Sequence, residues 1–402
     1  MNLPAPTTTR PQTHVAVLLI LSLTHLLNDL SQSLIPAIYP IIKDTYSLDF
    51  VQIGMISLTF QIAGSLLQPA VGFYTDKHPM PYSTVVGMTF TLAGLLGLAF
   101  ASSYGFILVS AASIGIGSSI FHPEATRMAR FASGGRLGFA QGLFQVGGQA
   151  GGALGPLLAA LIIVPRGQTS LAWFSAAALL SMVLMFWTAG KHTEIRNRIA
   201  AVMASLPGAA AKAPSHSAAT IAVGMTVLTL LMFSKNAYGE SFRSFYTFYL
   251  IDRFGVSIQT SQLMLFVFLI SAGAGALIGG IVGDKIGRYR IIWISILGPL
   301  PFSLLLPYAD LFWTGVLTIF INLIMASAFA SILIYAFELV PNRVGLVGGL
   351  FYGLNFALGG IAAAILGGFA DSIGIERVYQ VCSLLPLGGL LTWFLPRIQE
   401  HR

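Results

Sequence analysis

Residues 72–77 read Gly-Phe-Tyr-Thr-Asp-Lys, and residues 280–285 read Gly-Ile-Val-Gly-Asp-Lys. Both are copies of one pattern, Gly-x-x-x-Asp-Lys, placed 208 positions apart, and each closes a long apolar stretch. A second pattern, Arg-x-Gly followed by Gly-Leu-Phe, occupies residues 136–144 and returns 207 positions later at 343–351. The two halves of the chain are therefore copies of one another.

Composition places both copies in a membrane. Hydrophobic residues make up 55% of the 402 residues, charged residues only 9%, and the mean hydropathy is +0.81. A soluble domain carries about a quarter charged residues. Apolar runs of about 20 residues, each long enough to cross a hydrocarbon core of roughly 30 Å, fill nearly the whole chain. We expect an all-α membrane protein with twelve transmembrane helices in two pseudo-symmetric six-helix bundles.

The expected spans are 15–42, 50–75, 82–101, 104–126, 137–163, 171–190, 218–250, 257–283, 290–308, 312–337, 344–370 and 377–396. They divide the chain into an N-terminal segment (1–14), a first bundle (15–190), a linker (191–217), a second bundle (218–396) and a tail (397–402). In a membrane protein, such a repeat builds a substrate site between two halves that move against each other.

The net charge of +7 reflects topology and not nucleic-acid binding. Loops on the side of the two termini hold most of the 21 Lys and Arg residues. The opposite loops hold Lys43, Arg166, Arg253 and Arg377. By the positive-inside rule, both termini are cytoplasmic. Residues 1–14 lack the order of a signal peptide, so we expect the first helix to remain in the mature protein.

The repeated Gly-x-x-x-Asp-Lys pattern resembles the cytoplasmic loop signature of the major facilitator superfamily. Its glycines permit a tight turn, and its carboxylate can meet the positive end of a neighbouring helix. The resemblance implies a gate latch, against the alternative of a simple topology signal. In the first copy, His78-Pro79-Met80-Pro81 replaces the Gly-Arg ending, so the second copy is the better latch candidate. The predicted gating residues are Gly72, Asp76, Lys77, Gly280, Asp284, Lys285, Gly287 and Arg288.

Glycines of the fifth stretch resemble the antiporter motif of drug–proton exchangers in the same superfamily. The residues concerned are Gly142, Gly151, Gly155 and Pro156. The match departs at Ala159-Ala160, where the family pattern has two glycines. Close helix packing by small residues is the alternative reading. A further family feature is missing, because Ala111 stands where drug exporters often carry an arginine before Gly115-Ile116-Gly117.

Proton coupling must therefore use other ionisable residues inside the membrane. His25 and Asp29 lie four apart on one face of the first stretch, and His122 lies in the fourth. A charge at the bilayer centre costs about 2.5–3.5 kcal/mol, so such residues normally face a cavity and function there. We predict that Asp29, His25 and His122 carry the proton. The alternative is a structural ion pair.

Substrate candidates centre on Lys235, in the seventh stretch, which mirrors the first. Lys235 has no acidic partner three or four residues away, so it either pairs with Asp29 across the cavity or receives an anion. Glu240 and Arg243, three apart, are spaced to neutralise each other. The predicted substrate ligands are Lys235, Arg243, Glu240, Asn28, Gln32, Arg127, Gln145, Asn236 and Asn355.

Several short motifs together resemble the fosmidomycin-resistance family of bacterial exporters, from about Leu21 to Pro396. They are Asn28-Asp29, Tyr39-Pro40, Gln52-Ile-Gly-Met55, Leu66-Leu-Gln-Pro69, Thr75-Asp-Lys77, Phe121-His-Pro-Glu124, Ala132-Ser-Gly-Gly-Arg136 and Gly298. The resemblance implies a multi-pass, proton-driven efflux pump of the bacterial inner membrane, acting on phosphonate antibiotics. We expect a small drug and protons as partners, a monomer, and no cofactor, metal or nucleic acid.

Three other functions compete with drug–proton antiport. A proton-coupled symporter of a small organic anion is possible on the same fold, although the glycine motif argues against it. An intramembrane enzyme is disfavoured because the sequence holds no His-Glu-x-x-His. A receptor is disfavoured because no loop is long enough for a soluble sensory domain.

Overall fold

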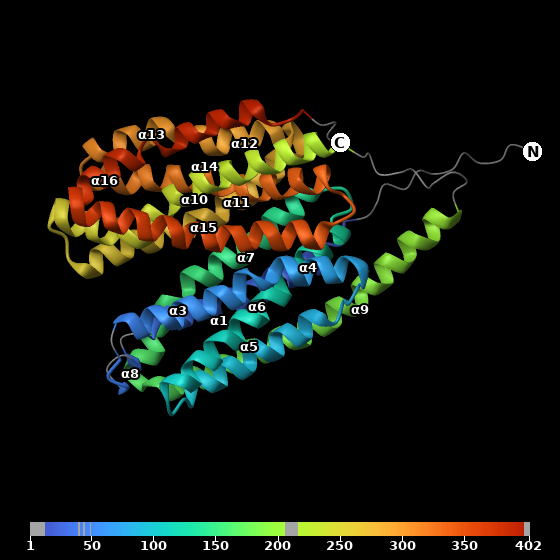
Figure 1. The fold of residues 1–402 in the computed structure, drawn as a ribbon, viewed down its shortest axis with the longest axis horizontal. Coiled ribbons are helices and arrows are strands. Elements are labelled where there is room, and N and C mark those ends of the chain that lie inside the picture. The colour runs from blue at the N-terminus through green and yellow to red at the C-terminus, as the bar shows by residue number, and fades with distance from the viewer. Residues whose placement is uncertain (1–12, 39–40, 43–44, 49, 206–215, 398–402) are drawn as a thin grey trace, which may run out of the picture.

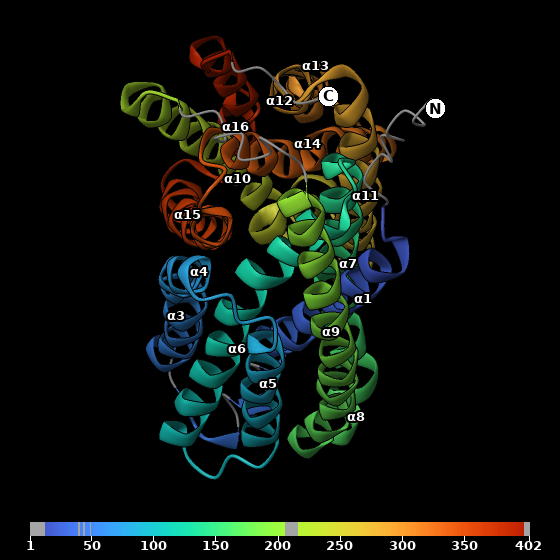
Figure 2. The ribbon, with the colours of Figure 1, turned by 90° about the vertical axis from the view of Figure 1, so that its right-hand side faces the viewer.

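The computed structural model describes residues 13–38, 41–42, 45–48, 50–205 and 216–397, and the regular elements in these ranges are all helical. Figure 1 shows two groups of helices, the N-terminal half below and the C-terminal half above. The groups lie close together near α4 and diverge toward the end that holds α8 and α16 (Figure 1). Figure 2, a view from the side, shows the same separation into halves.

The N-terminal half consists of six rods, some of them built from several helices in line. They are α1 (Val15–Ala37); α3 (Phe50–Ser65) with α4 (Leu67–Lys77); α5 (Ser83–Ala99); α6 (Tyr104–Ala132); α7 (Leu137–Leu158) with η1 (Ala159–Ile163) and α8 (Val164–Arg166); and η2 (Gln168–Phe174) with α9 (Ser175–Ser205).

The C-terminal half repeats this plan. Its rods are α10 (Ala218–Phe254); α11 (Ile258–Ile286); α12 (Arg288–Leu297) with α13 (Leu300–Leu305) and η3 (Leu306–Tyr308); α14 (Leu311–Leu339); α15 (Val344–Ile373); and α16 (Ile375–Cys382) with η4 (Leu385–Phe394). The twelve rods follow the twelve spans expected from the apolar runs.

Local sequence explains where the rods begin and end. Ser103, Ser217 and Ser257 cap α6, α10 and α11 by accepting a hydrogen bond from the backbone three residues later. Gly255 ends α10 with a φ of 62°, a left-handed conformation that favours glycine. Pro299 separates α12 from α13, because proline cannot donate the hydrogen bond that would continue the helix.

The rods differ in length and apolar character, and so in how clearly each one is identified as a membrane span. Among the residues that the structure describes, seven helices are long and apolar enough to cross a membrane. Others are shorter or are divided, as α3 and α4 are. The boundary predicted at residue 190 also differs, because α9 continues to Ser205 through the first part of the expected linker. The rest of that linker falls largely on residues 206–215, outside the described residues, as do 1–12 and 398–402.

The glycines of α7 bring two different neighbours close. A Cβ atom at Gly147 would collide with the carbonyl oxygen of Ser22 on α1, and one at Gly151 would collide with that of Leu26. Gly142 faces the other half, where a Cβ atom would lie 2.7 Å from the carbonyl oxygen of Ala276 on α11. The glycine motif therefore packs α7 against its own half along one part and against the opposite half near its start.

We predict that Gly147→Ala destabilises the protein through this contact with α1. Forcing a methyl group into a packed interface costs about 1–3 kcal/mol. The melting temperature in detergent should fall clearly. Gly152→Ala is the matched control, since a Cβ atom there meets nothing within 4 Å and the gain in helix propensity is the same. Equal melting temperatures for the two variants would contradict the prediction.

Candidate functional site

The two halves are joined by Asp284, which ends the second copy of the repeated pattern. Its carboxylate accepts hydrogen bonds from the backbone N–H groups of Gly138 and Phe139, both at 2.8 Å. These groups belong to the first turn of α7, where the helix carries partial positive charge. Arg288 donates to the same carboxylate at 2.8 Å. A carboxylate of one half is thus held by a helix N-terminus of the other.

The first copy makes the reciprocal contact. Asp76 accepts from the N–H groups of Gly345 and Leu346 in the first turn of α15, again at 2.8 Å. Its cationic partner is Arg127 of α6, at 2.6 Å, so a neighbouring helix supplies an arginine in place of the Gly-Arg ending that the first copy lacks. Both copies therefore form the contact, although the sequence favoured the second.

Glycines permit these contacts by letting the backbones touch. A Cβ atom at Gly72 would collide with the carbonyl oxygen of Gly345, and one at Gly280 with that of Gly138. Gly287 ends α11 with a φ of 95°. Lys77 and Lys285 are exposed and are not partners in the hydrogen bonds described for the two carboxylates. The gating role of the whole set stays a prediction.

A second group of polar residues gathers around Asp29 within the N-terminal half. The Nε2 atom of His25 lies 3.2 Å from one carboxylate oxygen, and that of His122 lies 3.5 Å from the other. Asn28 and Gln32 each donate to Asp29 at 3.0 Å. Both histidines are buried, whereas the Asp29 side chain keeps 20% exposure. The three residues predicted to carry protons thus form one cluster, named here the His–Asp cluster.

Backbone carbonyls fix the tautomers of both histidines. The Nδ1 atom of His25 lies 2.8 Å from the carbonyl oxygen of Phe144, and that of His122 lies 3.0 Å from the carbonyl oxygen of Ser118. A carbonyl oxygen only accepts, so each Nδ1 carries hydrogen. Each Nε2 therefore faces the carboxylate and can hydrogen-bond to it only when it also carries a proton. Each Nε2 atom is thus the ring nitrogen that lies next to the carboxylate of Asp29.

The same three side chains have the composition of a metal site. Their candidate ligand atoms lie within 4.8 Å of one another. However, Oδ1 of Asp29 already accepts from the amides of Asn28 and Gln32, and His122 lies beside the same oxygen. A metal ion would have to displace these donors.

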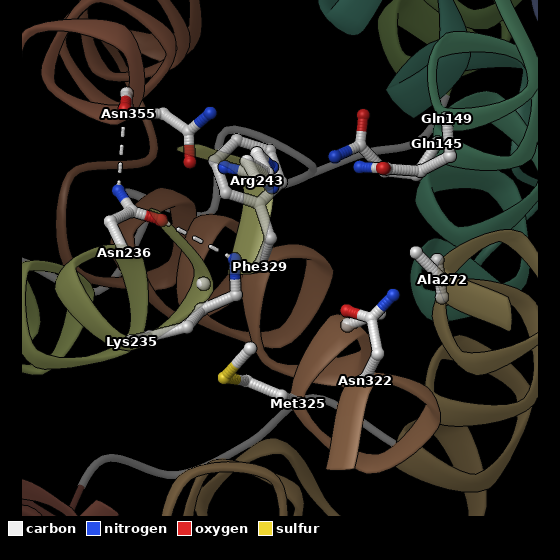
Figure 3. A pocket seen from close by; sticks show the side chains of 13 residues that line it. Gln145, Gln149, Lys235, Asn236, Arg243, Ala272, Asn322, Met325, Phe329 and Asn355 are labelled. Atoms are coloured by element: carbon white, nitrogen blue, oxygen red, sulfur yellow. Dashed lines mark hydrogen bonds between the residues drawn. The ribbon is translucent and has the colours of Figure 1, made fainter. Parts of the chain in front are cut away.

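A pocket lies between the halves, next to this cluster. The space within it, including open solvent, is about 490 Å³. Figure 3 shows Lys235, Asn236 and Asn355 on one wall and Gln145 with Gln149 of α7 on the other. The full lining is Gln145, Gln149, Lys235, Asn236, Gly239, Arg243, Ala272, Ala276, Asn322, Met325, Ala326, Phe329 and Asn355.

The sequence and this two-half architecture match one family. The model of the Major Facilitator Superfamily matches residues 21–364 and again 227–401. The chain belongs to the Major Facilitator Superfamily. It is therefore a multi-pass membrane transporter of a small-molecule substrate and not an enzyme.

Two bacterial relatives cover nearly the whole transporter. It is 53% identical over 396 residues to the fosmidomycin resistance protein of Escherichia coli K12, covering 98% of this chain and 95% of that protein. It is 39% identical over 400 residues to the uncharacterized MFS-type transporter YfnC of Bacillus subtilis 168, covering 98% and 97%.

Solved structures share the fold at low identity. The transporter FucP in its outward conformation superimposes with a TM-score of 0.74 at 13% identity, covering 96% of this chain and all of that one. The human organic anion transporter MFSD10 gives a TM-score of 0.73 at 16% identity, covering 95% and 99%. Both comparisons support the major facilitator fold alone.

In this major facilitator fold, Lys235 is the pocket's central cation. Its ammonium lies 3.5 Å from the side-chain oxygen of Asn236 and 5.9 Å from the centre of the Phe329 ring. Among the described residues, it forms no ion pair. Pairing with Asp29, one of the two roles suggested by the sequence, is absent, because Asp29 is engaged by histidines of its own half.

The remaining predicted ligands lie in three places. Arg243 lines the pocket and approaches Glu240 at 3.6 Å, the pair that their spacing favours. Asn28 and Gln32 serve the His–Asp cluster and do not line the pocket. Arg127 is held away from it by Asp76 and by Glu124, the latter at 2.7 Å.

Two polar residues that line the pocket, Gln149 and Asn322, are not among the ligands predicted from the sequence. Gln149 stands one helical turn after Gln145, so that spacing could have indicated it. The side chain of Pro156 lies outside the described residues.

We predict that Asp76→Asn and Asp284→Asn each open the cytoplasmic side. An amide accepts through one oxygen only and lacks the charge, so it loses charge-assisted hydrogen bonds worth about 1.5–3 kcal/mol each. A contact made in one state biases the equilibrium between states. In everted vesicles, a cysteine introduced at Asn322 should react several-fold faster with an impermeant maleimide. Glu194→Gln is the control, and unchanged labelling from both sides would leave the two carboxylates as turn residues only.

Proposed function

We propose that this transporter exports small anionic drugs, with phosphonates such as fosmidomycin as its principal class, in exchange for protons. The observation that carries the proposal is Lys235, an ammonium group in a pocket between the halves with no ion pair in the described part of the chain. A buried cation without an anion is costly, so the pocket favours an anionic guest. The position between two repeats is where such transporters bind substrate.

The chemistry of the pocket supports a phosphonate. A phosphonate offers three oxygens, and charge-assisted hydrogen bonds to an ammonium or guanidinium are the strong ones. Lys235 and Arg243 supply the cations, and the amides of Gln145 and Gln149 supply further donors. The name of the 53% identical relative from Escherichia coli points to the same class of drug.

We place proton transfer at the His–Asp cluster. Each histidine faces Asp29 through the nitrogen that its backbone contact leaves open, so protons taken up there lie between a ring and the carboxylate. Asp29 is the partly exposed member, which gives the cluster access to water. The cluster lies within the N-terminal half, whereas both halves line the drug pocket, so we expect exchange to operate through the movement of one half against the other.

Topology completes the proposal. We place the protein in the bacterial inner membrane as a monomer, with both termini in the cytoplasm, because Lys and Arg gather on the terminal side. The close contacts made by Asp76 and Asp284 then seal the cytoplasmic side in this structure. The halves diverge at the outer end (Figure 1), the arrangement from which a drug leaves and protons are taken up.

Transport of fosmidomycin in proteoliposomes tests direction and coupling together. With an acidic lumen, an antiporter accumulates the drug as protons leave. With an alkaline lumen, a symporter of an organic anion would accumulate it instead. A panel of phosphonates and cationic drugs would define the range of substrates. Accumulation that ignores the pH gradient in both cases would reject proton coupling.

We predict that Lys235→Met weakens phosphonate binding by about tenfold or more, which corresponds to loss of one charge-assisted hydrogen bond. Methionine keeps the length of the side chain and removes the charge. Dissociation constants at fixed pH would measure the effect, and Lys235→Arg should restore part of the affinity. Lys191→Met, which removes an exposed lysine paired with Glu194, is the matched control. Equal losses for anionic, neutral and cationic drugs would show that Lys235 is structural.

We predict that Asp29→Asn abolishes uphill transport while leaving drug exchange intact. The amide of asparagine does not take up a proton, so the variant cannot bind one between this side chain and His25 or His122. A pH gradient then no longer drives the transport cycle. Exchange of labelled for unlabelled drug needs only the moving halves and the pocket. Both rates can be measured in the same proteoliposomes. Uphill pumping with unchanged pH dependence would remove Asp29 from the coupling reaction.

A further inference from the structure

Tyr352 and Gln145 occupy the same place in the two copies of the repeat. Each is the residue that follows Gly-Leu-Phe, at 142–144 in one half and 349–351 in the other. The hydroxyl of Tyr352 donates to the side-chain oxygen of Gln145 at 2.9 Å, and both side chains are buried. Equivalent positions of the two halves are thus bonded directly to each other.

The ring of Tyr352 lies between the His–Asp cluster and the drug pocket. One neighbour is His122, with ring centres 4.8 Å apart and planes tilted by 34°. Another is Phe329, which lines the pocket, with ring centres 4.9 Å apart. Gln145 itself lines the pocket. One side chain therefore contacts a proton-cluster residue and two pocket residues.

Movement of the halves must break these contacts. Tyr352 belongs to α15, whereas His122 and Gln145 belong to α6 and α7 of the other half. Six residues separate Tyr352 from Leu346, whose N–H is held by Asp76, so Tyr352 lies about 9 Å deeper along the same helix. When the N-terminus of α15 leaves Asp76, Tyr352 leaves His122 and Gln145 with it.

We propose that Tyr352 is a positioning residue that couples the proton cluster to the drug pocket. This inference rests on the proposed proton–drug exchange and adds the contacts through which a change at one site alters the other. In the structure described here, Tyr352 covers His122 and occupies the oxygen of Gln145, which leaves the amide hydrogens of Gln145 for an anion. Loss of either contact changes the other, because both belong to one rigid aromatic side chain.

The ionisable groups around this contact are few. Asp29 and His25 face it from α1, His122 from α6 and Tyr352 from α15. The sequence of α7, 137–158, contains no ionisable residue. Lys235 of α10 faces the same region across Phe329 of α14. A change in charge at the cluster is therefore communicated through Tyr352 without a competing charged partner on α7.

The test is Tyr352→Phe, which keeps the ring and removes the bond to Gln145. Tyr379→Phe is the matched control, because the Tyr379 hydroxyl donates to the backbone oxygen of Ser241 at 2.8 Å within a single half. Full-length protein in lipid nanodiscs would be used for both. Tyr352→Leu, which also removes the aromatic contact with His122, serves as a second variant.

The first measurement is the affinity for fosmidomycin between pH 6 and pH 8. In the unaltered protein, we expect the affinity to fall by about tenfold as protons load the cluster, a usual size for coupling between two sites. In Tyr352→Phe this dependence should shrink several-fold, and in Tyr352→Leu it should disappear. Tyr379→Phe should keep it, even if its melting temperature falls.

The second measurement is the distance between spin labels at His78 and Arg290, exposed residues on the cytoplasmic side of opposite halves. Tyr352→Phe should raise the cytoplasm-open population by about fivefold, the equivalent of one net hydrogen bond, and weaken its response to pH. This readout needs no drug. Failure of the unaltered protein to bind fosmidomycin would overturn the proposed function, whereas wild-type pH responses in both Tyr352 variants would overturn the role of Tyr352.

Discussion

The relative placement of the two bundles depends on two carboxylates, each hydrogen-bonded to a helix N-terminus of the opposite half. Asp76 and Asp284 each accept two backbone N–H bonds, and each also meets an arginine. Backbone donors cannot be reoriented without moving the whole helix, so these bonds fix the relative placement of the two bundles. The glycines beside them are required because only bare backbone lets α4 reach α15 and α11 reach α7 so closely. The pocket, which both halves line, keeps its geometry only while both of these contacts hold.

Duplication gave the halves one plan, but their chemistry has separated. Asp29 and its two histidines stand in the first half, and Lys235 stands in the second, on the helix that mirrors α1. Opposite charges at mirrored places would neutralise each other if they touched, and the structure keeps them apart: Asp29 is surrounded by donors of its own half, and Lys235 faces the shared pocket. The two groups therefore stay separate, Asp29 with the donors of its own half and Lys235 at the pocket that both halves line.

Much of the fold follows from the sequence, and less of the site does. The apolar runs and the repeat are sufficient to predict twelve rods in two groups, and the four-residue spacing is sufficient to place His25 beside Asp29. Contacts between different rods were harder to predict from the sequence. Arg127 looked like a drug ligand because its partner Asp76 lies on another helix, and no local spacing reveals that pair. Asn28 and Gln32 were assigned to the drug as well, although both donate to Asp29 of their own helix. The helical course of α9 beyond residue 190 was missed because its sequence is polar there, and polarity marks the end of a membrane span without ending a helix.

The bond between Tyr352 and Gln145 also bears on the history of the molecule. At the moment of duplication, the two copies were identical, so this central place held the same residue twice. Two identical side chains facing each other across an axis make a contact without direction, since either one is equally donor or acceptor. A tyrosine opposite a glutamine, with the tyrosine as the donor, makes the two halves distinguishable at their centre. The two halves thus share one plan and differ in their chemistry at this central pair.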